Sequence, residues 1–169
     1  MQMHDNYMQM HLLQAHVSCG PMAIDDDALG AWRAFLTAHA HVTRAISRDL
    51  TEAGLPDLTW YDLLWALYRR PERRLRVNEL AREVVLSPTA MSRFVDRVEA
   101  AGYVRREPDP ADRRALQVAI TDEGVALLRR MWPIYEAGID RHFAAFLGRS
   151  APRVRAMLER MADSARPGS

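Results

Sequence analysis

The clearest pattern of hydrophobic and polar positions along this chain lies in residues 87–102. Apolar side chains recur there at helical spacing and would form one buried stripe, made of Met91, Phe94, Val95 and Val98. The opposite side is polar or cationic and carries Thr89, Ser92, Arg93, Asp96 and Arg97. Ser87 suits the N-cap, Pro88 the first turn, and Gly102 the residue that ends the helix. The pattern predicts an amphipathic helix whose outer face is available for polar contacts.

Two shorter helices are predicted just before this one. The first spans about residues 60–70 and begins at Thr59, with Asp62 in a capping-box position. The second spans about residues 79–85, with Asn78 as its N-cap. Because a very short connection joins the second helix to the polar-faced helix, the pair is typical of a helix-turn-helix.

After Gly102 the apolar residues no longer recur at helical spacing but alternate with polar ones. Residues 103–107 are a strand candidate, and prolines on either side of Asp109 then break regular structure. A second strand follows, in which Leu116, Val118 and Ile120 should face the core. The two strands predict a hairpin, and a hairpin beside two such helices is a winged helix-turn-helix. A short extended piece is also expected at residues 75–77.

Long apolar helices flank this unit. They are predicted at about 26–53, at 122–147 with a kink at Pro133, and from Ser150 onward. The fold class expected is mainly α with a small β wing. Its expected parts are an N-terminal extension at 1–24, a helical dimerisation region at 25–57 and 121–165, and a winged helix-turn-helix DNA-binding lobe at 58–120. The extension would be disordered or would add a helix to the dimer interface, and Met22 is an alternative start.

Composition narrows the classes of function. The net charge is only +1, so contact with nucleic acid must come from local clustering. The densest cluster lies in residues 69–76, which hold five arginines and one glutamate. This run either contacts phosphates or is a solvated loop. All basic residues are arginine, which reflects either codon usage in a GC-rich genome or the bidentate chemistry of guanidinium.

Several classes of site are disfavoured by the sequence. The single cysteine, Cys19, excludes a disulfide framework within the chain. The spacing of His4, His11, His16 and Cys19 fits no zinc pattern, and no cofactor is expected. No run is apolar and long enough to span a membrane, so we expect a cytoplasmic protein. No phosphate-binding loop and no hydrolase or metalloprotease motif is present, which argues against an enzyme.

Two motifs resemble one protein family. The run DPADRRALQVAITDEG at 109–124 is similar to the wing signature of MarR-family regulators of bacterial transcription. The run SPTAMSRFVDRVEAAGYVRR at 87–106 resembles the recognition helix of that family and the segment that follows it. The resemblance covers about residues 29–161 and leaves residues 1–24 outside. It implies a homodimer that binds double-stranded operator DNA with an inverted repeat.

The resemblance also implies which residues contact DNA. The expected major-groove set is Pro88, Thr89, Ser92, Arg93 and Arg97. The expected wing contacts are Arg113, which would enter the minor groove, with Asp112 and Arg114 beside it. Arg76, at the end of the basic run, is a further candidate for phosphate contact. Asp96 is unfavourable beside phosphates unless it is paired, and we expect it to pair with Arg93 or Arg97 rather than to accept from cytosine.

The family resemblance further implies a repressor that a small aromatic or phenolic ligand releases from DNA. Candidate pocket residues are Trp32, Tyr61, Asp62 and Trp65. Tryptophans at helical spacing are more often core residues than ligand walls, and a helix-capping role explains Asp62. Two other functions remain open: a winged-helix protein that acts through a protein partner, and a redox- or metal-responsive regulator that uses Cys19.

Overall fold

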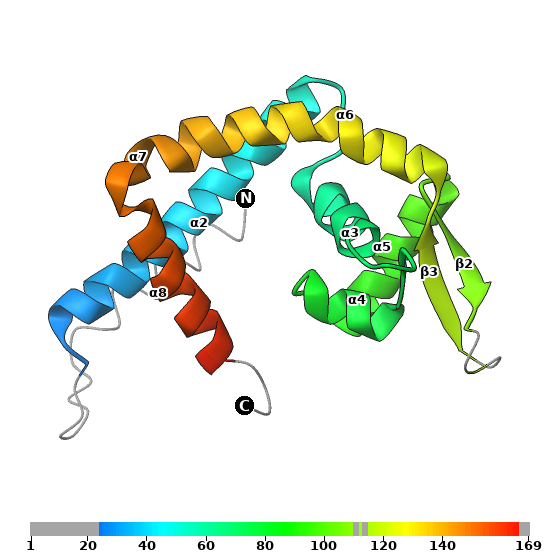
Figure 1. The fold of residues 1–169 in the computed structure, drawn as a ribbon, viewed down its shortest axis with the longest axis horizontal. Coiled ribbons are helices and arrows are strands. Elements are labelled where there is room, and N and C mark those ends of the chain that lie inside the picture. The colour runs from blue at the N-terminus through cyan, green and yellow to red at the C-terminus, as the bar shows by residue number, and fades with distance from the viewer. Residues whose placement is uncertain (1–23, 110–111, 113–114, 166–169) are drawn as a thin grey trace, which may run out of the picture. The chain divides into compact units, whose positions relative to one another are not determined.

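The computed structural model describes residues 24–109, 112 and 115–165. The chain divides inside its first described helix into two compact units, Met1–His39 and Ala40–Ser169. In order, the elements are α2 (Asp26–Glu52), α3 (Leu58–Tyr68), β1 (Arg74–Arg76), α4 (Val77–Glu83), α5 (Pro88–Ala100), β2 (Val104–Pro108), β3 (Leu116–Ile120), α6 (Asp122–Ile139), η2 (Asp140–Ala144), α7 (Ala145–Leu147), η3 (Gly148–Ser150) and α8 (Ala151–Ser164). The fold is mainly helical with one small antiparallel sheet, as predicted (Figure 1).

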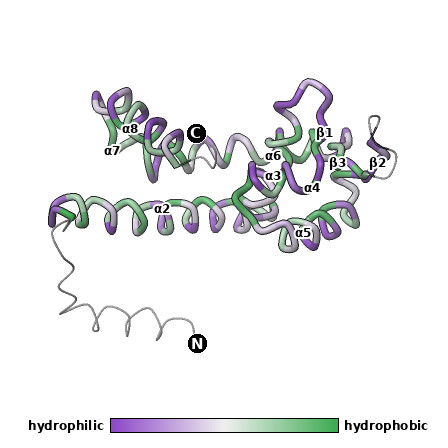
Figure 2. The backbone as a smooth tube through the Cα atoms, turned by 90° about the horizontal axis from the view of Figure 1, so that it is seen from below, coloured by the Kyte–Doolittle hydropathy of each residue, from purple (hydrophilic) through white to green (hydrophobic). Residues whose placement is uncertain are grey.

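Helix α5 forms as the sequence predicts. The Ser87 hydroxyl accepts a hydrogen bond from the backbone N–H of Ala90 at 3.2 Å, and Pro88 occupies the first turn. Gly102 ends the helix with a φ of +81°, a conformation that costs glycine little. All four residues of the apolar stripe are buried. Hydrophilic and hydrophobic colours accordingly alternate along α5 in Figure 2.

The caps predicted for α3 and α4 are wrong. The Asp57 carboxylate caps α3 by accepting from the backbone N–H of Thr59 at 2.9 Å, so Asp62 is not needed for this purpose. At α4 the N-cap is Arg76 rather than Asn78. The Glu79 carboxylate accepts from the Arg76 backbone N–H at 2.9 Å. Each predicted start lies two residues too late because a second polar residue near the first turn gives a similar signal.

The sheet has three strands in the order β1-β3-β2, all antiparallel. The short extended piece expected at residues 75–77 is its edge strand, β1, in which Arg76 lies opposite Gln117. The prediction that Leu116 faces the core is wrong, since it is 51% exposed, whereas Ala119 is buried. Leu116 lies at the outer end of β3, opposite Pro108 of β2, whereas Ala119 lies between Arg74 of β1 and Arg105 of β2.

The core of the second unit joins α3, α4, α5 and the sheet to the first half of α6. Its fully buried side chains include Leu63, Leu67, Leu80, Val95 and Val118. Helix α6 begins at Thr121, whose hydroxyl accepts from the Gly124 N–H at 3.0 Å and donates to the Gly102 carbonyl at 2.8 Å. The start of α6 is therefore held against the end of α5.

The C-terminal helices follow the predicted order. The helix expected at 122–147 is present as α6, η2 and α7, and Pro133 lies inside α6. The departure from α-helical geometry comes later, at the π-helical turn η2. None of the described residues of α8 is buried, although Val154 and Leu158 are half-buried. No helix among the described residues is long and apolar enough to cross a membrane.

Candidate nucleic-acid interface and aromatic groove

The outer face of α5 is open to solvent. The expected major-groove residues Pro88, Thr89, Ser92, Arg93 and Arg97 are all exposed. They project from a helix that four buried side chains hold in place, so the face is rigidly presented. The Arg97 guanidinium lies 5.2 Å from the centroid of the Phe94 ring. Arg93 forms no ion pair with any residue that the structure describes, which leaves its guanidinium available.

Asp96 is paired, but not with the residues that we expected. Its Oδ1 lies 2.6 Å from Nη2 of Arg106 in β2, rather than beside Arg93 or Arg97. The same guanidinium binds Glu99, and the Arg106 backbone N–H donates to Glu99 at 2.7 Å. The turn at Gly102 brings β2 back against α5, so the partner comes from the following strand.

Arg76 is engaged at the base of the wing. Its Nη2 lies 2.5 Å from Oδ2 of Asp109, a carboxylate that is only 3% exposed. The hydrogen bond to Asp109 raises the pKa of Arg76. Asp109, which we did not select from the sequence, therefore positions this arginine. Its only sequence signal was a carboxylate between two loop-forming prolines.

The loop at the tip of the wing is closed by backbone hydrogen bonds. The Asp109 N–H donates to the Ala115 carbonyl at 3.0 Å, and the Ala115 N–H donates to the Asp112 carbonyl at 2.9 Å. Asp112 is exposed. The two arginines expected at the tip, Arg113 and Arg114, lie outside the described residues.

Much of the basic run at 69–76 is neutralised within the chain. Arg69 and Arg70 both bind Glu83 of α4. Arg74 pairs with Glu72 and reaches Glu107 of β2 at 3.7 Å. Arg69 and Arg70 thus link the turn after α3 to α4, and Arg74 links β1 to β2. Whether the run also contacts phosphates stays a prediction.

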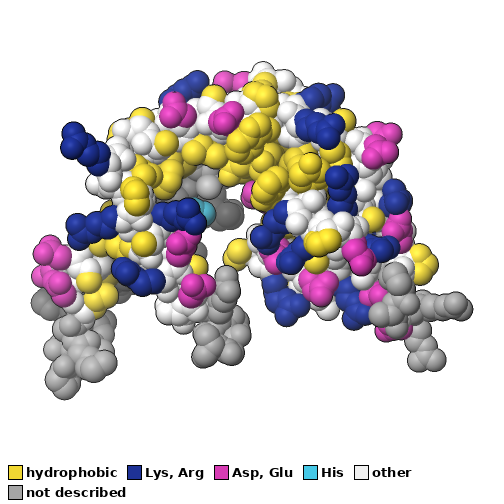
Figure 3. Space-filling model, viewed as in Figure 1, with side chains coloured by type: hydrophobic (Ala, Val, Ile, Leu, Met, Phe, Trp, Pro, Cys, Tyr) yellow, Lys and Arg dark blue, Asp and Glu magenta, His cyan; other side chains and the backbone are white. Residues whose placement is uncertain are grey.

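A groove of about 510 Å³ lies between α3 and α6. Hydrophobic side chains gather along this part of the surface (Figure 3). Three of the four residues expected in a pocket line it, namely Tyr61, Asp62 and Trp65. Trp32 belongs to the first unit and is absent from the lining. The other lining residues were missed, and they are Tyr68, Val125, Leu128, Arg129, Trp132, Tyr135 and Ile139.

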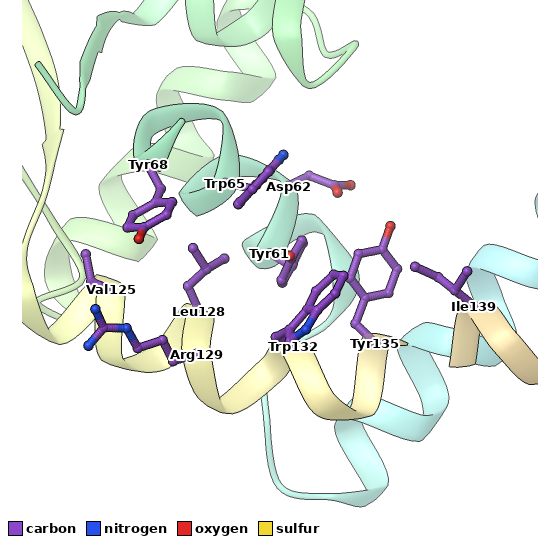
Figure 4. A pocket seen from close by; sticks show the side chains of 10 residues that line it. All are labelled: Tyr61, Asp62, Trp65, Tyr68, Val125, Leu128, Arg129, Trp132, Tyr135 and Ile139. Carbon is purple, nitrogen blue, oxygen red and sulfur yellow. The ribbon is translucent and has the colours of Figure 1, made fainter. Parts of the chain in front are cut away.

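Half of the residues that line the groove are aromatic (Figure 4). The Tyr61 and Tyr135 rings meet edge to face with centroids 4.5 Å apart. Trp132 stacks on Tyr61 at 6.3 Å, and Trp65 stacks on it at 6.4 Å. Trp65 is 46% exposed, so it is a wall residue rather than a core residue. The spacing of Trp132 and Tyr135 on one side of α6 could have revealed this surface from the sequence.

The polar groups of the groove are a carboxylate, three phenols, two indole N–H groups and a guanidinium. Burial raises the pKa of Asp62 to about 6, with a smaller contribution from the negative charge of Asp57. Asp62 as a residue is exposed to solvent, so its carboxyl group is shielded from water on one side only. Burial also raises the pKa of Tyr61 to about 12, and that of Tyr135 in the same direction. Arg129 lines the groove from α6, among Tyr68, Val125 and Leu128 (Figure 4).

A metal-dependent mechanism finds no support in the part of the chain that the structure describes, where no cluster of His, Cys, Asp or Glu could hold an ion. The residues considered for such a role, His4, His11, His16 and Cys19, fall outside it.

Comparison with known proteins gives matches over most of the chain. A model of the MarR family matches residues 53–115. YkoM of Bacillus subtilis, an uncharacterized HTH-type transcriptional regulator, is 29% identical over 69% of this chain and 74% of its own length. The structure resembles that of Sco3205, a MarR family transcriptional regulator from Streptomyces coelicolor in complex with DNA, with a TM-score of 0.78 and 29% identity. That match covers 88% of this chain and 93% of Sco3205.

A ligand-bound structure is also similar. CouR from Rhodococcus jostii RHA1, bound to p-coumaroyl-CoA, aligns with a TM-score of 0.66 and 26% identity, over 84% of this chain and 96% of its own. The relatives are transcriptional regulators and not enzymes. Sequence and structure agree in these comparisons: the chain matches the MarR family model over its winged helix-turn-helix part, and its fold resembles that of MarR family, DNA-binding transcriptional regulators.

Proposed function

We propose that this protein is a homodimeric repressor that binds an inverted-repeat operator and leaves it when a small aromatic ligand binds. The observation that carries the proposal is the outer face of α5, where Arg93 projects without an ion pair to any described residue. The proposed contacts with DNA are Arg76, Pro88, Thr89, Ser92, Arg93, Arg97 and Asp112, together with Arg113 and Arg114. Side chains of these types read base edges and hold phosphates.

Arg76 has a double role in this proposal. Its guanidinium forms an ion pair with Asp109 on one side, yet the side chain is 45% exposed. A phosphate could therefore approach its open side while Asp109 holds it in position. Sco3205, whose fold is similar, is known in complex with DNA, which supports the use of this lobe.

Exposed apolar surface supports the homodimer. Within the second unit Phe146 is 82% exposed, Met161 55% and Phe143 42%. Within the first unit Trp32 is 53% exposed and stacks on Phe35. Apolar side chains gathered on terminal helices call for a partner surface, and a second copy of the chain supplies one. The dimerisation region would be residues 25–57 and 121–165, and two lobes 58–120 would read half-sites about one helical turn apart.

The groove between α3 and α6 supports the ligand. Flat aromatic walls suit a flat aromatic molecule, and the polar groups of Asp62 and Arg129 can orient it. CouR, a relative, has been captured with p-coumaroyl-CoA. A ligand there would release DNA only if it binds more tightly to the dimer whose lobes do not fit the operator.

DNA binding is tested by fluorescence anisotropy with the DNA upstream of the protein's own gene and a shuffled duplex. We expect tight binding to the first only. Arg93→Ala should weaken specific binding by about 1–3 kcal/mol and relax the preference at one base pair. Arg130→Ala removes an exposed α6 arginine far from α5 in sequence and serves as the control. No specific binding by the wild type at low salt would refute the proposed function.

Ligand release is tested by a thermal-shift screen of aromatic acids and phenols, followed by anisotropy with bound operator. A genuine effector should raise the melting temperature and weaken operator binding. Trp65→Ala should reduce both effects, because it removes an exposed wall of the groove. A compound that stabilises Trp65→Ala as well as the wild type binds elsewhere.

A further inference from the structure

One arginine joins the wing to the polar face of α5. Arg106 of β2 pairs with Asp96 and Glu99, which lie three residues apart on α5. Its backbone N–H also donates to Glu99 at 2.7 Å, so both the main chain and the side chain of Arg106 bind α5. The Arg106 side chain is only 23% exposed, in contrast to 61% for Asp96.

Asp96 lies between two arginines proposed to contact DNA. It is on the exposed face of α5, with Arg93 three residues before it and Arg97 directly after it. An unpaired carboxylate there would repel the phosphates that approach this face. Arg106 neutralises the charge from the wing side, and the two neighbouring arginines keep their guanidinium groups for DNA.

The other charged residues of β2 are engaged elsewhere. Arg105 binds Glu107, and Glu107 reaches Arg74 of β1. Among the ion pairs of the described residues, only those of Arg106 link β2 to α5. Because β2 is also hydrogen-bonded to β3, these ion pairs connect the hairpin to the helix.

We propose that Arg106 is a positioning residue for DNA binding: it masks the charge of Asp96 at the DNA-facing surface of α5. The proposal rests on the proposed function, in which this face of α5 meets DNA. It concerns a residue that is not expected to touch DNA itself.

The test is a double-mutant cycle on operator affinity. Arg106→Gln should weaken binding about five- to tenfold, because it leaves Asp96 charged and unmasked beside the phosphates. Asp96→Asn alone should change affinity less than about threefold. The double variant Asp96→Asn/Arg106→Gln should recover most of the affinity lost in Arg106→Gln, because the unmasked charge is gone. Affinity is measured at two salt concentrations, and the loss should shrink at high salt.

Two further variants separate charge masking from simple loss of structure. Glu99→Gln removes a contact of Arg106 but leaves Asp96 masked, so operator affinity should stay near that of the wild type. Arg106→Lys keeps the positive charge but lacks the guanidinium group that binds Asp96 and Glu99 together. It should therefore lose less affinity than Arg106→Gln. Circular dichroism and the melting temperature show whether each variant folds.

Three results would overturn the inference. They are an unchanged affinity for Arg106→Gln, no recovery in the double variant, or a loss in Glu99→Gln as large as that in Arg106→Gln. Failure of the proposed function looks different. In that case neither the wild type nor Arg93→Ala binds any duplex selected from a random pool, whereas failure of this inference alone leaves specific binding and its sensitivity to Arg93→Ala intact.

Discussion

Arg76 and Asp109 are 33 residues apart in the chain, and their side chains meet at the root of the wing. Two guanidinium nitrogens, Nε and Nη2, reach the same carboxylate oxygen at 2.6 and 2.5 Å. Asp109 is almost fully buried, so its charge depends on this partner. The wing loop begins at Asp109, and the ion pair therefore fixes where the loop leaves the sheet.

Removal of this ion pair should loosen the wing. Arg76→Met removes the guanidinium that binds the buried Asp109 carboxylate, and we expect the melting temperature to fall by roughly 4 °C or more. Amide hydrogen exchange should rise in the loop between β2 and β3, with little change in α3. Arg76→Met/Asp109→Asn also removes the buried negative charge and should recover part of the loss. An unchanged melting temperature in Arg76→Met would show that the ion pair contributes nothing to stability.

Val85 forms a strained turn between α4 and α5. Its φ is +58°, a left-handed conformation that is unfavourable for a β-branched residue, and its side chain is 87% exposed. Val85→Gly should relieve the strain and stabilise the protein by about 0.5–1 kcal/mol, after allowance for the greater freedom of glycine in the unfolded chain. Val85→Ala should gain less. Urea denaturation measures both, and a destabilised glycine variant would show that the turn is not strained.

Gly124 leaves no room for a side chain. A Cβ at this position would lie 2.2 Å from the Tyr103 carbonyl oxygen and 2.8 Å from Cγ1 of Ile120. Gly124→Ala should destabilise the fold by about 2–4 kcal/mol, because the start of α6 must move away from the wing. The control is Gly30→Ala in α2, where nothing lies within 4 Å and helix propensity favours alanine. Thermal unfolding should separate the two variants clearly, and equal effects would contradict the close packing at Gly124.

Asp62 should make stability depend on pH. Its pKa is raised from the ordinary 3.8 to about 6, chiefly by burial. Between these values the folded protein binds more protons than the unfolded chain, so stability falls as pH rises through that window. Asp62→Asn removes the cost of the charge, and we expect it to be more stable than the wild type at pH 7.5 by about 1 kcal/mol. That figure is small because solvent screens a partly exposed carboxylate.

The pH profile of unfolding provides the check on Asp62. The difference in melting temperature between wild type and Asp62→Asn should be largest above pH 6, shrink as the pH falls from 6 to 3.8, and level off at lower pH, where the carboxyl becomes protonated in both states. Parallel curves for the two proteins across this range would rule out the raised pKa.

The recognition-helix and wing patterns were predictable from sequence because their signals are local. The cap of α5, its apolar stripe and its glycine stop all lie within residues 87–102, and the structure confirms them. The strands of the wing were visible from alternation, apart from the exposed end at Leu116. The caps of α3 and α4 were misplaced because two polar residues competed within one turn. Strand β1 is three residues long, too short for any periodicity, and its pairing with β3 is what defines it.

The sequence by itself determined the class of protein and the face of α5 that is open to solvent, because both depend on patterns between near neighbours in the chain. Only the tertiary structure decided the partners of the charged and aromatic side chains. Asp96 meets Arg106 rather than its neighbours on the helix, and Arg76 meets Asp109 across the sheet. Tyr61 meets Tyr135 from a helix more than seventy residues away. A side chain pairs with the groups that the fold places close to it in space, and this spatial distance cannot be read from the separation of two residues in the sequence.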